Sequence, residues 1–174
     1  MIAKASRMRI SADSDIETAT TVATLRALGR RVLDLEAEDK VHQARITSIV
    51  RMWRPDLLEL CGVGPIVAAT VLCSWSHTGR FRSEGAFASL AGVAPIPASS
   101  GMTNRHRLNR QGDRQLNRAM HVVVINRIRH DSDTRAYFDR RRKEGKSDRE
   151  IKRCLKRYVA RQLFRQLEGA PTGA

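Results

Sequence analysis

The strongest constraint on the fold is a set of positions between Leu25 and Trp53 that recur at alternating spacings of three and four residues. This spacing places the positions along one side of an α-helix, as in the heptad repeats of coiled coils. We call this set the seam, and it comprises Leu25, Leu28, Val32, Leu35, Asp39, His42, Ile46, Ile49 and Trp53. Two interpretations stay open: a coiled-coil linker or dimerisation arm, or a long amphipathic helix that lies on its own domain.

The expected fold class is all-α, with a long N-terminal helix followed by a compact helical domain. Glycine and proline cluster between residues 62 and 112, and the segments on either side have helical periodicity. No alternation of polar and apolar residues persists long enough to predict a sheet. We expect an irregular N-terminus over 1–19, the coiled-coil-like helix over 20–54, the compact domain over 55–130, basic helices over 131–168 and a disordered tail over 169–174.

The charge of the chain predicts a polyanionic partner. The formal net charge is +14, and residues 101–174 hold 20 of the 32 lysines and arginines but only 8 of the 18 acids. Lysine and arginine gain most by displacing counterions from phosphates, so nucleic acid is the leading partner class. The C-terminal half is the expected contact region.

The cysteines and the apolar segments exclude other classes of protein. Cys61, Cys73 and Cys154 are too scattered for a thiolate metal site and are expected to be small core residues. The N-terminus does not resemble a secretory signal, and the longest apolar run is far below the ~20 residues that span a bilayer. We therefore expect a soluble cytoplasmic protein with no membrane partner.

The stretch LLELCGVGPIVAATVL, residues 57–72, resembles a helix-hairpin-helix motif. A first helix is expected to end at Cys61 and a second to begin at Pro65, where the missing N–H of proline costs nothing. In such a motif the backbone of Gly62, Val63, Gly64 and Pro65 would contact a DNA phosphate without reading the base sequence. An ordinary helical hairpin with a glycine turn is the alternative.

A serine loop follows, in the stretch FASLAGVAPIPASSG at residues 87–101. Pro95 and Pro97 hold the chain extended, so Ser99 and Ser100 are expected on a loop. The residues after the loop include the cations Arg105, Arg107, Arg110, Arg114 and Arg118, and Asp113 is a predicted N-cap for a helix from Arg114 to about Arg129. On that helix Leu116, Met120, Val123 and Val124 are expected to face the core.

A serine that attacks phosphorus needs cations on the scissile phosphate, and guanidinium groups suit that role. His106 is the only nearby candidate for a general base. Taken alone, a Ser-Ser-Gly loop is more often a turn than a nucleophile.

The C-terminal segment favours binding over chemistry. Ser147 and Glu150 form a predicted capping box for a basic helix. Its expected buried stripe is Ile151, Leu155, Tyr158, Val159, Leu163 and Leu167, with the cations mostly on other faces. Tyr137 and Tyr158 are both interpreted as core residues, which argues against a tyrosine recombinase.

Three stretches in this order and spacing, LCGVGPIVAATVL, FRSEGAFASLAGVAPIPASSG and HRLNRQGDRQLNRAM, resemble the C-terminal domain of the insertion-sequence transposases related to the Piv and MooV DNA invertases. The resemblance covers about residues 55–130 and implies that Ser100, followed by Gly101, is the nucleophile, with Ser99 a weaker candidate. It also implies an N-terminal domain with four acidic metal ligands, DNA as substrate and, in some members, a guide RNA.

The chain departs from that pattern at Arg110-Gln111-Gly112 and Leu116-Asn117. Asp13, Asp15 and Glu17 are interpreted as solvated charge rather than metal ligands, so no cofactor is expected in this chain and Mg²⁺ only with the missing acidic domain. A truncated transposase, homo-oligomeric through its N-terminal helix, is the expected identity.

Whether the chain is an enzyme alone stays open. The alternatives are a non-catalytic DNA- or RNA-binding module, such as a remnant that competes with intact transposase, and a structural RNA-binding protein.

Overall fold

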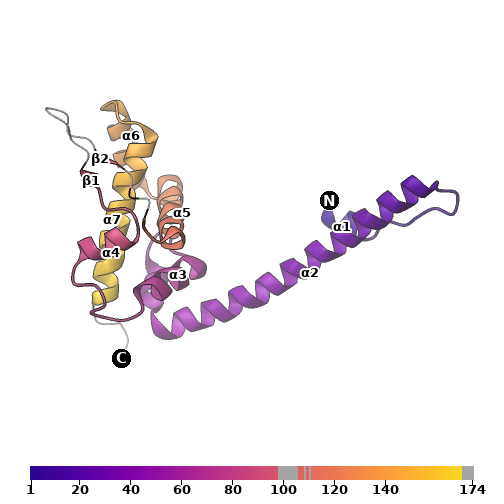
Figure 1. Cartoon of the computed structure of the whole chain (residues 1–174), viewed down its shortest axis with the longest axis horizontal. Helices are drawn as coiled ribbons and strands as arrows, with labels where there is room; N and C mark the ends of the chain where they lie inside the picture. Colours follow the sequence, from indigo (N-terminus) through magenta and orange to yellow (C-terminus); the bar gives the residue numbers. More distant parts are fainter. Residues whose placement is uncertain (98–105, 108, 110, 170–174) are drawn as a thin grey trace. The chain divides into compact units, whose positions relative to one another are not determined.

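The computed structural model describes residues 1–97, 106, 107, 109 and 111–169, which are helical apart from one short strand pair (Figure 1). The α-helices are α1 (Ile2–Ala5), α2 (Ile16–Trp53), α3 (Pro65–Trp75), α4 (Glu84–Leu90), α5 (Arg114–His130), α6 (Ser132–Lys143) and α7 (Asp148–Glu168). A 3-10 helix, η1 (Pro55–Glu59), follows α2, and β1 (Ile96–Pro97) pairs antiparallel with β2 (His106–Arg107). The all-α prediction with a long N-terminal helix is confirmed. Within the described residues, no helix is long and apolar enough to cross a membrane.

The chain forms two compact units, Met1–Ile46 and Thr47–Ala174. In the first unit, the segment before α2 is more regular than expected. The backbone of Ser6, after α1, lies so close to Gly29 that a Cβ there would be 2.7 Å from the Ser6 nitrogen. α2 begins at Ile16 rather than at residue 20, because the Asp15 carboxylate accepts a hydrogen bond from the Thr18 N–H at 2.6 Å.

Most of the seam on α2 is exposed. Leu25, Leu28 and Leu35 are 42%, 58% and 45% exposed. In the second unit, Val50 is buried, whereas the seam residues Ile49 and Trp53 are 52% and 62% exposed. α2 therefore packs on the core of this unit through a side other than the seam, and most of the apolar seam remains exposed.

α5 lies at the centre of the second unit, in contact with α3, α6 and α7, and α4 packs on α7. The predicted core positions of α5, Leu116, Met120, Val123 and Val124, are all buried. On α7, the buried residues are Ile151, Leu155, Val159, Ala160, Leu163 and Leu167.

Three core predictions are wrong. Tyr158 is 52% exposed, because it lies about 100° around the helix from Val159, which occupies the buried position. Cys61 and Cys73 are also exposed.

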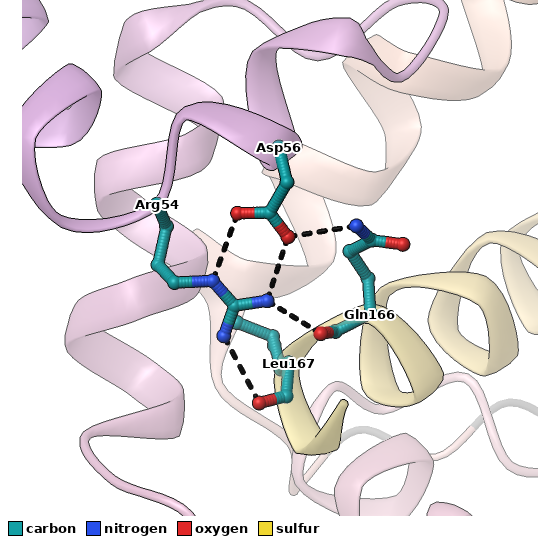
Figure 2. A network of polar contacts seen from close by, with 4 residues as sticks. All are labelled: Arg54, Asp56, Gln166 and Leu167. Atoms are coloured by element: carbon teal, nitrogen blue, oxygen red, sulfur yellow. Dashed lines mark hydrogen bonds and ion pairs between the residues drawn. The ribbon is translucent and has the colours of Figure 1, made fainter. Parts of the chain in front are cut away.

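A buried polar network joins the start of the second unit to the end of α7 (Figure 2). The Arg54 guanidinium donates to both carboxylate oxygens of Asp56, at 2.9 and 2.7 Å, and to the carbonyls of Gln166 and Leu167. The Gln166 amide donates to the same carboxylate at 2.7 Å. The last carbonyls of a helix have no partner within it, and Arg54 supplies hydrogen-bond donors to two of those carbonyls at the end of α7.

Candidate nucleic-acid interface

The predicted helical hairpin differs from the structure in its first arm. The helix expected to end at Cys61 is the short 3-10 helix η1, which begins at Pro55 and ends at Glu59. The second arm is as predicted, since α3 begins with Pro65 at its first position and Gly64 as its N-cap. The helix-hairpin-helix motif is therefore not shown, and its phosphate contact stays a prediction.

Much of the glycine turn packs against α5. Gly62 has φ +80°, and a Cβ there would be 3.0 Å from the Val123 carbonyl. Val63 is buried, and the Arg127 Nε donates to the Cys61 carbonyl at 2.8 Å. These packing contacts within the protein account for the glycine at position 62.

The other end of the turn is open. Gly64 is exposed, and a Cβ there would meet no atom within 4 Å. The first-turn amides of α3 have no partner within the helix, so Gly64 and Pro65 mark the part of the turn that an anion could approach.

The base of the predicted serine loop is held on both sides by α5 and its N-cap segment. The Asp113 N–H donates to the Leu90 carbonyl at 2.6 Å, and the Asn117 side chain donates to the Ala91 carbonyl at 2.7 Å. Gly112 lies against Gly92, where a Cβ on Gly112 would be 2.4 Å from the Gly92 nitrogen. This contact brings the two ends of the loop together.

Asp113 caps α5 as predicted. Its carboxylate accepts from the Gln115 and Leu116 N–H groups at 2.8 and 3.0 Å, and the Ser74 hydroxyl donates to it at 3.0 Å. The backbone hydrogen bond from Leu116 holds the pKa of this carboxyl below its ordinary value. The cap therefore stays negatively charged at neutral pH and complements the positive end of the helix.

The structure describes only some of the candidate catalytic and phosphate-binding residues. Ser99, Ser100, Arg105 and Arg110 lie outside the described residues. Arg107 is described through its backbone, which pairs with Ile96 in the strand pair. Arg114 and Arg118 are exposed, one turn apart at the start of α5.

The turn and the arginines lie at opposite ends of α5. Ser74, near the end of α3, binds Asp113, whereas Gly62, before α3, contacts the segment around Asn126. α3 and α5 therefore run antiparallel. At about 1.5 Å per residue, Arg114 and Asn126 are roughly 18 Å apart along the axis. The predicted interface is thus two separate regions, and only the one with Arg114 and Arg118 adjoins the serine loop.

A pocket beside the loop base was missed by the sequence analysis. Its volume is about 810 Å³. It is lined by Gly92, Val93, Ala94, Pro95, Asn109, Asn117, Tyr137, Arg141, Lys146, Glu150, Arg153, Cys154, Lys156, Arg157, Tyr158 and Arg161. The Tyr137 and Tyr158 rings meet edge to face, with centroids 5.8 Å apart. The one sign of this pocket in the sequence is that Tyr158 falls one position before Val159, outside the four-residue spacing of the buried residues on α7.

The electrostatics of the pocket are strongly positive. Six of its lining side chains are cations and one is a carboxylate. Burial lowers the pKa of Lys156, which donates to the Asn117 side chain at 2.7 Å. Among the described residues, no group of three or more His, Cys, Asp and Glu side chains could hold a metal ion.

A basic helical domain with an arginine-flanked loop is the class of structure that the geometry defines. Residues 55–139 match the model of the IS116/IS110/IS902 transposase family. The chain is 33% identical over 153 residues to an insertion element IS900 uncharacterized 42 kDa protein of Mycobacterium paratuberculosis, covering 86% of this chain and 38% of the relative.

A second relative comes from another organism. The chain is 34% identical over 114 residues to an insertion element IS110 uncharacterized 43.6 kDa protein of Streptomyces coelicolor, covering 65% of this chain and 28% of the relative. The chain thus spans well under half the length of either relative. Together the family match and the two relatives support an insertion-sequence transposase.

Proposed function

We propose that the chain takes part in DNA transposition as the serine-bearing domain of a transposase. The observation that carries this proposal is the loop base, where Gly92, Gly112 and Asp113 hold both ends of the segment containing Ser100 next to Arg114 and Arg118. A clamped loop beside exposed guanidinium groups suits attack on a bound phosphate, because positioning and charge stabilisation supply most of the rate enhancement in phosphoryl transfer.

In the proposed reaction the Ser100 hydroxyl oxygen forms a bond to phosphorus, and the bond from phosphorus to a deoxyribose oxygen breaks. The serine proton passes to a base, for which His106 is the candidate, and the released oxygen takes up a proton. Arg105, Arg107, Arg110, Arg114 and Arg118 would hold the phosphate. Any Mg²⁺ would be bound by the acidic domain that the family resemblance implies.

Gly64 and Pro65 have a different proposed role. Because their turn contacts α5 near Asn126, roughly 12 Å along the axis from Arg118 and roughly 18 Å from Arg114, they would hold the DNA backbone some distance from the bond that breaks. A guide RNA and self-association through the seam are further proposed partners.

The test is a denaturing gel of the chain with labelled insertion-element-end DNA and Mg²⁺, with and without the acidic domain supplied as a separate polypeptide. We expect a covalent adduct when the acidic domain is present. Ser100→Ala should abolish the adduct, while the control Ser99→Ala should retain it. An adduct undiminished by Ser100→Ala would remove Ser100 from the mechanism.

A non-catalytic DNA-binding module is the second candidate, favoured by the basic pocket and the exposed arginines. Tight, salt-sensitive binding with no adduct under either condition would support this candidate and overturn the first.

A further inference from the structure

The basic pocket beside the loop base is lined by α6, α7 and the segment that leads into the serine loop. Its floor is the polar side of α7, where Glu150, Arg153, Arg157 and Arg161 recur at spacings of three and four. One wall comes from α6, with Tyr137 and Arg141, and the other from the segment Gly92–Pro95 that leads into the serine loop. In Figure 1, β1 and β2 accordingly lie beside α6 and α7.

Most of the pocket cations already have partners. Arg157 and Arg161 both pair with Glu84 of α4, and Arg141 pairs with Glu144. Lys156 is bound to Asn117.

The side chains of the remaining two cations, Lys146 and Arg153, form no hydrogen bond or ion pair within the part of the chain that the structure describes. Both cations interact electrostatically with Glu150, whose carboxylate also accepts the Ser147 N–H at 3.0 Å in the capping box. Two cations are thus available to an anionic ligand.

The aromatic wall supplies a second recognition element. Tyr158 is 52% exposed although it is a large ring on an otherwise well-packed helix. It meets Tyr137 edge to face, and the Arg161 guanidinium lies over the Tyr158 ring, 5.9 Å from its centroid. An exposed aromatic ring beside a guanidinium group is suited to stacking on a nucleic-acid base, because both kinds of group stack on bases.

We propose that this pocket binds one unpaired nucleotide of a DNA strand, with its base against Tyr158 and its phosphate on Lys146 and Arg153. The volume of about 810 Å³ lies in the range of sites for single small ligands and is too small for a duplex. Because Pro95 and Asn109 line the pocket and flank the serine loop, the nucleotide would neighbour the phosphate that Ser100 attacks. This last point, and the choice of DNA over RNA, rest on the proposed function.

The first experiment measures binding of the full chain to a fluorescent oligothymidylate of about 12 nucleotides, within the usual size of a single-strand site. We expect Tyr158→Ala to weaken this binding roughly 5- to 150-fold, the effect of losing one base stack, and Tyr158→Phe to retain it. A duplex of the same length should bind equally to wild type and Tyr158→Ala, because its bases are already paired.

Arg153→Ala tests the phosphate contact, and Arg165→Ala is its matched control. Arg165 is an exposed arginine of the same helix outside the pocket. We expect Arg153→Ala to weaken single-strand binding more than Arg165→Ala, although both remove one charge. Equal effects would assign the affinity to general charge and overturn the proposal.

A photochemical measurement locates the base directly. Irradiation of an oligothymidylate with one iododeoxyuridine should cross-link it to Tyr158 or Tyr137, as mapped by mass spectrometry. Cross-links confined to other regions, or wild-type affinity in a Tyr158→Ala protein with an unchanged circular dichroism spectrum, would overturn the proposal. Tighter, Tyr158-dependent binding of the matching RNA oligonucleotide would replace DNA by RNA as the ligand.

The experiments can reject the proposed pocket and the proposed Ser100 nucleophile independently of each other. Tyr158-dependent strand binding without a Ser100 adduct would keep the pocket and reject the chemistry. An adduct with no Tyr158 dependence in binding would do the reverse.

Discussion

Gly92 and Gly112 are in direct backbone contact, and this contact sets how the serine loop is held. Gly112→Ala would place a Cβ 2.4 Å from the Gly92 nitrogen and 2.8 Å from the Leu90 carbonyl, which are backbone atoms that cannot move aside. We expect a loss of unfolding free energy of about 1–3 kcal/mol, typical of overpacking, measured by urea denaturation.

The control for this substitution is Gly85→Ala, within α4. Its Cβ would meet only the Ser83 hydroxyl oxygen, at 3.7 Å. Because alanine favours a helix over glycine, this variant should be neutral or more stable by up to about 1 kcal/mol. A Gly112→Ala protein as stable as wild type would show that the loop base can shift.

Asp56 gives a prediction about pH. Hydrogen bonds from Arg54 hold the pKa of the Asp56 carboxyl below its ordinary value of 3.8. The folded state therefore binds the proton less tightly than the unfolded state, so the carboxylate stabilises the protein above pH 3.8 and this contribution is lost as the pH falls through the folded-state pKa.

We expect the unfolding free energy of wild type to fall on acidification below pH 3.8 more steeply than that of Asp56→Asn, as measured by urea midpoints across that range. Asp34→Asn, at an exposed position of α2, should follow wild type. Identical pH dependence in wild type and Asp56→Asn would contradict the role of this pair.

Residues that act within one turn of chain were predictable. The Asp113 cap, the Ser147–Glu150 box and Pro65 all follow from short-range rules and are confirmed. Tyr158 and Gly62 were not, because their surroundings come from α6 and α5 and no local pattern encodes those contacts.

At the scale of elements, the long helix α2 carries the clearest untested prediction. The seam on α2 is apolar and exposed, so burial against a second copy would be favourable. We expect Leu28→Asp with Leu35→Asp to convert a self-associated chain to monomer, as measured by light scattering after size-exclusion chromatography. Leu33→Asp, also exposed but off the seam, should keep the assembly. A monomeric wild-type chain would contradict the prediction.

The helices themselves were largely predictable from apolar periodicity, and α2, α5 and α7 lie close to the expected ranges. The arm before the glycine turn was not, because a five-residue 3-10 helix and one turn of α-helix have nearly the same apolar spacing. Leu57, within η1, is fully buried, so its surroundings come from tertiary contacts that this spacing does not encode.

For the whole molecule, the net charge of +14 predicts strongly salt-dependent binding to duplex DNA. Each phosphate contact contributes about 0.9 to the slope of log affinity against log salt concentration. If both arginines contact phosphates, Arg114→Ala with Arg118→Ala should lower the slope by about 2, as measured by fluorescence anisotropy over a salt series.

Arg30→Ala with Arg31→Ala removes the same charge from α2, outside the predicted interface, and should change the slope little. Equal changes in both double variants would mean that DNA binding follows total charge and has no defined site.

Arg54 also bears on how the molecule forms during synthesis. Its partners Gln166 and Leu167 come more than a hundred residues later in the chain. Ribosomes add about 5–20 residues per second, so Gln166 and Leu167 are synthesised several seconds after Arg54. Until then the Arg54–Asp56 pair lacks the acceptors that make its burial tolerable. The domain therefore completes its fold only after its final helix has emerged, and a product that terminates before Gln166 is a natural target for chaperones and proteases.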